Sequence, residues 1–246
     1  MKGKVIKLII VVLVIIAAFT AVSRYQRGKA RGEFARQIFG LGGGISPVSI
    51  EEIRATINAN EKQMDRFVET AARTGTYWKI LGTRLADRGL HGEALEAYKR
   101  AIYYTPTDPS LHYSAGVSAT ILAKSFYAFP GRENIEREEH YNFAEQAFLR
   151  AIELDGRYLR PRYSLGVLYV FELDMPEKAI LHLERCLEIS RNDTDAMFVL
   201  ARAYFMMQRF NEAVDLYDRI ISSTKDAQKR IDAQNNRQQL LGQMDG

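Results

Sequence analysis

One pattern constrains this chain more than any other. Small, aromatic and branched residues recur at fixed spacings four times, with a period near 34 residues. The clearest copy contains Trp78, Leu81, Gly82, Leu85, Gly89, Ala94, Tyr98, Ala101 and Pro106. Small side chains at Gly82 and Ala94 would let two antiparallel helices approach closely, and Pro106 would end the second helix because it lacks a backbone N–H. A repeated unit of this length predicts a stack of helix pairs.

Three weaker copies follow the first. They begin at Pro109, near Leu159 and near Thr194. Their small and apolar positions are Gly116, Ala144, Phe148 and Ala151; Leu165, Gly166, Tyr169, Ala179, Leu183 and Cys186; and Leu200, Ala201, Tyr204, Ala213, Tyr217 and Ile220. We expect these residues to fill the spaces within and between helix pairs.

With these residues, the chain resembles the tetratricopeptide-repeat (TPR) family. In the first copy only Leu85 departs, because the family has an aromatic residue there. The resemblance implies an all-α superhelix of about four helix-turn-helix repeats. Their expected ranges are residues 75–108, 109–158, 159–193 and 194–226.

Helical caps are predicted at both ends of the repeats. In the N-terminal cap, residues 49–74, Ser49 and Glu52 form a capping box that Asn60 and Gln63 repeat, which predicts two short helices or one helix with a weak middle. The C-terminal cap and tail cover residues 227–246, with a helix over 227–241. We expect its inward residues to be Ile231, Leu240 and Leu241, and its outward residues to be Lys229, Arg230, Asn235, Asn236 and Arg237.

The N-terminal segment, residues 1–31, predicts a transmembrane helix. Residues 8–22 are free of charge and are flanked by lysines and arginines. The run is short for a bilayer, so an uncleaved anchor and a signal cleaved after Ala21-Val22-Ser23 both remain open. A glycine-rich flexible linker follows over residues 32–48. The expected location is a bacterial-type inner membrane, crossed once, with the C-terminal body outside the cytoplasm.

The charge distribution argues against a nucleic-acid partner. The formal net charge is +4, but seven of the 34 Lys and Arg residues lie in the first 31 residues, where there is no acid. From residue 32 onward, 27 bases face 30 acids. The basicity therefore flanks the apolar segment, and the body lacks the excess of bases typical of a DNA- or RNA-binding surface.

The second copy contains a 16-residue insertion. The alanine expected twelve positions after Gly116 is found only at Ala144. We expect both helices of this pair to continue for about two extra turns, to a tip that carries Phe126, Tyr127 and Phe129. These aromatic residues are either an exposed contact site or a local core.

The resemblance also implies a concave face, lined by the first helix of each repeat, that binds a peptide or a protein. The family's groove positions correspond here to Lys79, Thr83, Tyr113, Val117, Arg160, Tyr163, Val167, Phe198, Arg202 and Phe205. This set combines aromatic side chains with bases that can bind carboxylates, so an acidic partner is expected. The aromatic side chains could instead pack between helices.

One well-known binding mode of the family is incomplete in this chain. The family's carboxylate clamp has a lysine where Lys79 stands, an asparagine where this chain has Thr83, and an arginine where it has Ser164. A complete clamp for a peptide's terminal carboxylate is therefore not expected.

No residue pattern predicts an enzyme, a metal site or a cofactor. The four histidines are scattered, and Glu136 with His140, the one pair at metal-ligand spacing, lies in a strongly charged segment. Cys186 falls at a small core position and is expected to be buried. The predicted function is thus a membrane-tethered scaffold. A soluble periplasmic adaptor, a self-assembling repeat protein and a membrane-bound enzyme with its chemistry in the hairpin are the alternatives.

Overall fold

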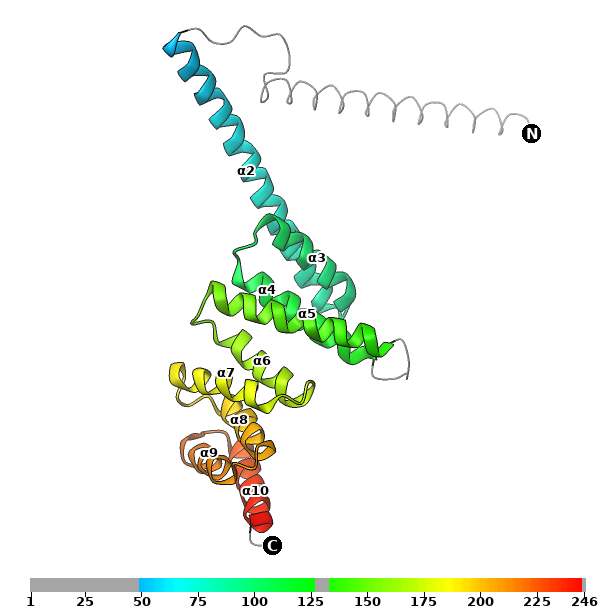
Figure 1. Cartoon of the computed structure of the whole chain (residues 1–246), viewed down its shortest axis with the longest axis vertical. Helices are drawn as coiled ribbons and strands as arrows, with labels where there is room; N and C mark the ends of the chain where they lie inside the picture. Colours follow the sequence, from blue (N-terminus) through cyan, green and yellow to red (C-terminus); the bar gives the residue numbers. More distant parts are fainter. Residues whose placement is uncertain (1–48, 127–132, 245–246) are drawn as a thin grey trace, which may run out of the picture. The chain divides into compact units, whose positions relative to one another are not determined.

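The computed structural model describes residues 49–126 and 133–244 of the chain (Figure 1). The chain divides into two compact units, Met1–Val68 and Glu69–Gly246. The predicted membrane segment, residues 1–31, and the linker, residues 32–48, lie outside the described residues. Within the described residues, no helix is both long enough and apolar enough to cross a membrane.

The described residues form helices and no strand, which confirms the all-α prediction. The helices are α2 (Ile50–Asp87), α3 (His91–Tyr104), α4 (Pro109–Ser125), α5 (Glu133–Leu154), α6 (Leu159–Phe171), α7 (Pro176–Ile189), α8 (Thr194–Met206), α9 (Phe210–Ser223) and α10 (Ala227–Met244). In the second unit the pairs α4/α5, α6/α7 and α8/α9 follow one another towards α10 (Figure 1). This arrangement is the predicted stack of helix pairs.

The N-terminal cap expected over residues 49–74 is not a separate element. The capping box at its start is present: the Ser49 N–H donates to Glu52 Oε2 at 3.3 Å, and the Glu52 N–H donates to Ser49 Oγ at 3.1 Å. Of the two expected arrangements, the single helix is present: α2 continues unbroken to Asp87, so no helix begins at Asn60. A new helix start would leave backbone N–H groups without acceptors, and residues 50–74 contain no Gly or Pro to break the helix.

Glycines set the distance between paired helices. A Cβ atom added at Gly82 would lie 2.7 Å from the Tyr98 ring, and one at Gly116 would lie 2.6 Å from the Phe148 ring. At Gly166 it would lie 2.6 Å from Leu183. The two helices of each of these pairs therefore fit together only because glycine has no side chain at the contact.

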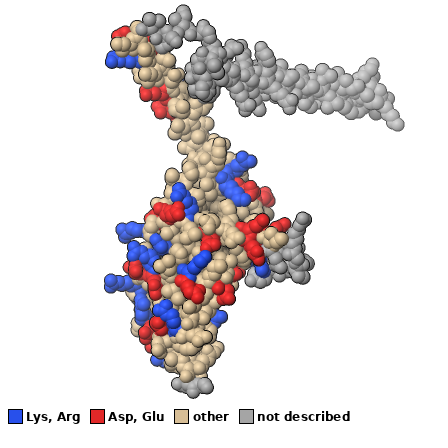
Figure 2. Space-filling model, in the orientation of Figure 1, with Lys and Arg blue, Asp and Glu red and all other residues tan. Residues whose placement is uncertain are grey.

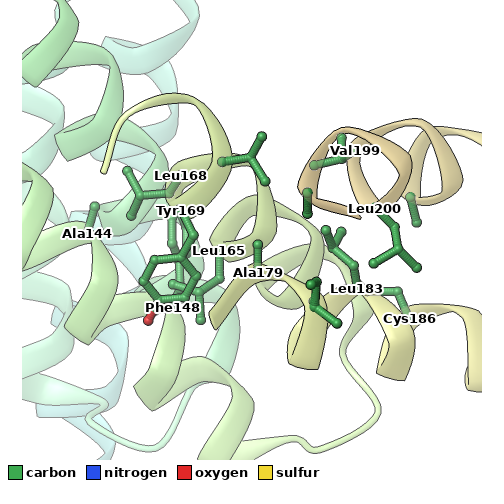
Figure 3. Close-up of a cluster of buried hydrophobic side chains, with 14 of the residues drawn as sticks. Ala144, Phe148, Leu165, Leu168, Tyr169, Ala179, Leu183, Cys186, Val199 and Leu200 are labelled. Atoms are coloured by element: carbon green, nitrogen blue, oxygen red, sulfur yellow. The ribbon is translucent and has the colours of Figure 1, made fainter. Parts of the chain in front are cut away.

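The remaining repeat residues build one continuous core. Figure 3 shows part of it, with Phe148, Leu165 and Tyr169 gathered between helices and Leu183 and Cys186 on the side of Leu200. Besides the three glycines, the predicted repeat residues with less than a tenth of their surface exposed are Ala94, Tyr98, Ala101, Ala144, Phe148, Ala151, Leu165, Tyr169, Ala179, Leu183, Cys186, Leu200, Ala201, Tyr204, Ala213, Tyr217 and Ile220. Trp78 and Leu85 are half-buried against the same core.

Two predicted core positions are exposed instead. Leu81 is 44% exposed, because among the described residues no helix pair precedes the first repeat to cover it. Ile231 of α10 is 48% exposed, whereas Ala233 and Leu240 are buried. Two residues correspond to about 200° around a helix, so burial of Ala233 turns Ile231 away from the stack.

Two side chains of the C-terminal cap that were expected to face outward instead make ion pairs with the repeats. Lys229 Nζ lies 2.7 Å from Asp195 Oδ1, and Arg237 Nε lies 2.7 Å from Asp218 Oδ1. These two side chains join α10 to α8 and α9, and both are half-buried.

The insertion lengthens both helices of the second pair, though unequally. Helix α4 has 17 residues against 13 in α6 and in α8, which is about one extra turn. Helix α5 has 22 residues against 14 in α3, α7 and α9, which is about two extra turns. The expectation of two extra turns is therefore right for α5 and too large for α4.

We predict that Gly116→Ala destabilises the repeats by about 1–3 kcal/mol, because the new methyl group meets the buried Phe148 ring. Gly92→Ala is the matched control, since nothing lies within 4 Å of a Cβ atom there. It should be neutral or stabilising by about 0.5–1 kcal/mol. Urea unfolding followed by far-UV circular dichroism measures both changes, and equal midpoints for the two variants would contradict the close-approach model.

Candidate functional site

We call the face that is lined by the first helices of the pairs the groove. Among the cavities that open on it, two are lined by three predicted groove residues each. The C-terminal cavity has a volume of about 320 Å³ and lies among α6, α8, α9 and α10. Its lining residues are Phe171, Phe198, Val199, Arg202, Phe205, Tyr217, Asn236, Gln239, Leu240 and Gln243. It therefore combines aromatic walls, amide groups and one guanidinium group.

Arg202 is the charged group of the C-terminal cavity. Its side chain is exposed, and its guanidinium carbon lies 5.2 Å from the centroid of the Phe205 ring. The described residues give it no ion pair. A guanidinium that stacks on an aromatic ring keeps its N–H groups free for a planar acceptor such as a carboxylate.

The aromatic walls of this cavity pack against other aromatic rings. The Phe198 ring lies 6.2 Å from the ring of buried Tyr217, and the Phe205 ring lies 5.8 Å from that of Phe210. Burial raises the pKa of Tyr217, so its hydroxyl stays neutral well above physiological pH. The aromatic walls are thus packed on other rings and uncharged, which suits an apolar side chain of a ligand.

The second cavity is apolar and has a volume of about 200 Å³. Its residues come from α4, α5, α6 and the turn after α6: Val117, Thr120, Ile121, Lys124, Phe148, Tyr163, Ser164, Val167, Leu168 and Glu172. At one end Lys124 Nζ lies 2.6 Å from Glu172 Oε1, and the Tyr141 hydroxyl donates to Glu172 Oε2 at 2.6 Å. Since Glu172 is only 7% exposed, these partners neutralise an otherwise costly buried charge.

The N-terminal groove positions are engaged within the chain. Lys79 Nζ lies 2.7 Å from Asp108 Oδ2 and donates to Ser110 Oγ at 2.7 Å. Burial alone would raise the pKa of Asp108, but the hydrogen bonds from Lys79 and Ser110 lower it below its usual value. Thr83 donates to the carbonyl oxygen of Lys79 at 3.0 Å. Lys79 therefore already has a carboxylate partner in its own chain.

The middle groove positions divide between packing and exposure. Tyr113 packs edge-on against Tyr158 with ring centroids 5.5 Å apart, so it serves helix packing. Arg160 is exposed in the first turn of α6. Of the ten predicted groove residues, Val117, Tyr163 and Val167 line the apolar cavity and Phe198, Arg202 and Phe205 line the C-terminal cavity. The other four, Lys79, Thr83, Tyr113 and Arg160, line neither cavity.

The amides of α10 were missed by the sequence prediction, which treated α10 only as a cap. Asn236 and Gln239 stand 34 residues after Arg202 and Phe205, and both line the same cavity. Continuing the repeat period by one more unit would have identified them. Helix α10 thus occupies the place of a fifth repeat's first helix.

The hairpin tip is described in part. Phe126 is half-buried and stacks on the His140 ring of α5, with centroids 5.8 Å apart and an interplanar angle of 12°. Burial, with a smaller contribution from Lys99, lowers the pKa of His140. For Phe126 the contact favours a local core. Tyr127 and Phe129 lie outside the described residues.

Chemistry-bearing groups are sparse in the described part of the chain. No cluster of three or more His, Cys, Asp or Glu residues that could hold a metal ion is found there. Cys186 is fully buried, with Sγ 3.9 Å from the carbonyl oxygen of Leu159, and burial raises the pKa of its thiol to about 11. Glu136 and His140 both lie on α5, but His140 is covered by Phe126.

Comparison with known proteins bears directly on these helix pairs. Residues 170–234 match the family model of the tetratricopeptide repeat. The described helices form a TPR-like helical-repeat superhelix. A TPR repeat-containing protein of Borreliella burgdorferi is 21% identical over 179 residues, which cover 73% of this chain and 76% of that protein. Anaphase-promoting complex subunit 3 of Schizosaccharomyces pombe is 26% identical over 152 residues, but these cover 62% of this chain and only 20% of that protein.

Several solved structures superpose on most of the chain. The crystal structure of MamA is 19% identical, with a TM-score of 0.53, and covers 72% of this chain and 95% of its own. MamA of Desulfovibrio magneticus RS-1, residues 41 to the end, is 16% identical with a TM-score of 0.54. It covers 69% of this chain and 92% of its own. Human IFIT1, solved as a dimer with m7Gppp-AAAA, is 18% identical with a TM-score of 0.60 and covers 76% of this chain and 44% of its own. At these identities the likeness establishes the fold alone.

We predict that Cys186 does not react with a thiol reagent in the folded protein at pH 8. A pKa of about 11 leaves about one thiol in a thousand ionised at that pH, and the side chain is fully buried. Titration with Ellman's reagent should give no labelling in native buffer and one thiol per chain in guanidinium chloride. Rapid labelling of the native protein would show that the core of the repeats opens readily near α7.

Proposed function

We propose that this protein is a membrane-tethered TPR scaffold without catalytic activity, whose groove binds a protein or peptide that presents an acidic group. The observation that carries the proposal is the C-terminal cavity, where exposed Arg202 stands beside aromatic walls. A guanidinium group and aromatic rings in one cavity suit a ligand that carries a carboxylate beside an apolar side chain.

The ligand chemistry follows from three kinds of lining group. Arg202 would pair with the carboxylate, while Phe198 and Phe205 would contact an adjacent apolar side chain. The amides of Asn236 and Gln239 can both donate and accept hydrogen bonds, so they fit the backbone of a peptide. Binding would thus use a short acidic and apolar motif.

The apolar cavity supports a second contact on the same ligand. Its charged end is already neutralised by the pair of Lys124 with Glu172, so its remaining walls favour an apolar side chain. Lys79 is not part of the proposed site, because Asp108 holds its ammonium group. The proposal therefore differs from recognition of a terminal carboxylate by a complete TPR clamp.

A nucleic-acid ligand is not proposed, although IFIT1 is known in complex with m7Gppp-AAAA. Residues 32–246 carry 27 bases against 30 acids. Figure 2 shows basic and acidic side chains interleaved on the visible face of the repeats. Binding to a phosphate backbone gains its affinity from clustered bases, and this face shows no such cluster.

The membrane tether rests on the sequence of residues 1–31. An uncharged run of 15 residues with basic flanks supports an uncleaved anchor, and the glycine-rich linker would separate it from the TPR body. We place the protein in a bacterial-type inner membrane with the body outside the cytoplasm. A soluble periplasmic adaptor is the alternative if the segment is removed as a signal.

The groove is tested by crosslinking full-length chains in membranes and recovering bound proteins, with Arg202→Glu compared to wild type. We expect a loss of tenfold or more in recovery of groove partners, because the variant places a carboxylate where the ligand's carboxylate should bind. Arg185→Glu is the control, since Arg185 is an exposed arginine of α7 that pairs with Glu188 away from the cavity. Recovery of the same proteins in equal yield from Arg202→Glu and Arg185→Glu would refute the groove proposal.

The tether has a separate test. The full-length protein should remain in the membrane pellet after extraction with alkaline carbonate, and its intact mass should include residues 1–31. A mature chain that begins near Arg24 and is released from spheroplasts would replace the tethered scaffold by the periplasmic adaptor.

A further inference from the structure

The first unit exposes a stripe of large apolar side chains. Its described residues, 49–68, include the first part of α2. There Ile50 is 64% exposed, Ile53 42%, Ile57 48% and Met64 54%. Phe67 is 49% exposed and Val68 61%, so six large apolar side chains are exposed within residues 50–68. Such a concentration is more than a soluble surface usually carries, and it points to a partner surface.

The stripe has the spacing of a coiled-coil seam. Steps of three and four residues lead from Ile50 to Ile53, Ile57, Asn60 and Met64, and the next step reaches Phe67. These are the a and d positions of consecutive heptads, which bring side chains to one side of a helix. The charged residues of the segment occupy the other heptad positions.

We propose that residues 50–67 of α2 form a parallel, in-register coiled coil with the same residues of a second copy of this chain. In that register each layer contains two identical residues. Ile57 meets Ile57 of the partner copy, and Asn60 meets Asn60.

Asn60 favours a second copy over an unrelated apolar partner. A buried amide is costly unless it is hydrogen-bonded, and the amide of an identical Asn60 in the same layer supplies both a donor and an acceptor. An apolar surface would satisfy neither. A single polar residue in the seam also specifies register, because a shifted pairing places Asn60 against an apolar side chain.

Charge and pattern disfavour two other occupants. Residues 50–68 carry four acids and three bases, so the segment lacks the cationic face of a helix that lies on anionic lipid. The apolar run at residues 8–22 of the same chain is apolar on every side in sequence, which suits a bilayer better than a narrow seam. A near-neutral segment also pairs with its own copy without strong repulsion.

Oxidative crosslinking of the full-length chain tests this pairing. Ile53→Cys places a thiol in the seam, and Ala55→Cys places one about 200° away on the same turn of α2. Wild type is the blank, because its one cysteine, Cys186, is fully buried. We expect at least about five times more disulfide-linked dimer from Ile53→Cys than from Ala55→Cys, since only parallel, in-register pairing brings the two seam thiols within bonding distance.

A second pair of variants tests the seam itself. Adding Ile57→Asp to Ile53→Cys should abolish the crosslink, because two carboxylates would face each other in one buried layer. Adding Asn58→Asp, one residue further on and off the seam, should leave the yield within about twofold. Equal crosslinking at positions 53 and 55, or a yield that Ile57→Asp does not reduce, would overturn the proposal. The absence of any dimer at position 53 would also overturn the proposal, since it would mean that lipid or the N-terminal segment of the same chain covers the stripe.

Discussion

The contact on which the repeat stack depends is the close approach of paired helices at one small residue per pair. The pairs that show it are Gly82 with Tyr98, Gly116 with Phe148, and Gly166 with Leu183. Each glycine fixes how its helix is rotated against its neighbour. The residue that follows, Val117 or Val167, is thereby turned toward the groove, where both line the apolar cavity. Packing within a repeat and presentation of the binding face are consequences of the same contact.

Polar contacts between successive repeats add directional hydrogen bonds and ion pairs to this apolar packing. The Tyr204 hydroxyl of α8 donates to Glu184 of α7 at 2.6 Å, and burial together with this hydrogen bond raises the pKa of Tyr204 to about 12. Tyr169 of α6 makes the equivalent bond to Glu145 of α5 at 2.6 Å. In the first repeat, Lys79 reaches forward to Asp108 at the start of α4. A lysine at a groove position is thus used to order the stack.

The insertion in the second repeat shapes the groove as well as the hairpin. Lys124 lies in the extra turn of α4, and from there its ammonium group pairs with Glu172, which follows α6. Without that turn the buried carboxylate would lose its charged partner. The longer α4 therefore closes one end of the apolar cavity, while Phe126 at the end of the helix packs against His140.

The sequence by itself determined the helix pairs, because close packing at Gly82 or Gly116 admits only one kind of side chain and so leaves a periodic trace. The same period, carried on by one unit, would also have placed Asn236 in the groove. Only the tertiary structure decided that Ile231 faces solvent and that Lys79 pairs with Asp108. These outcomes depend on contacts between residues that are distant in sequence and that the packed helices bring together. A local repeat pattern does not encode those contacts.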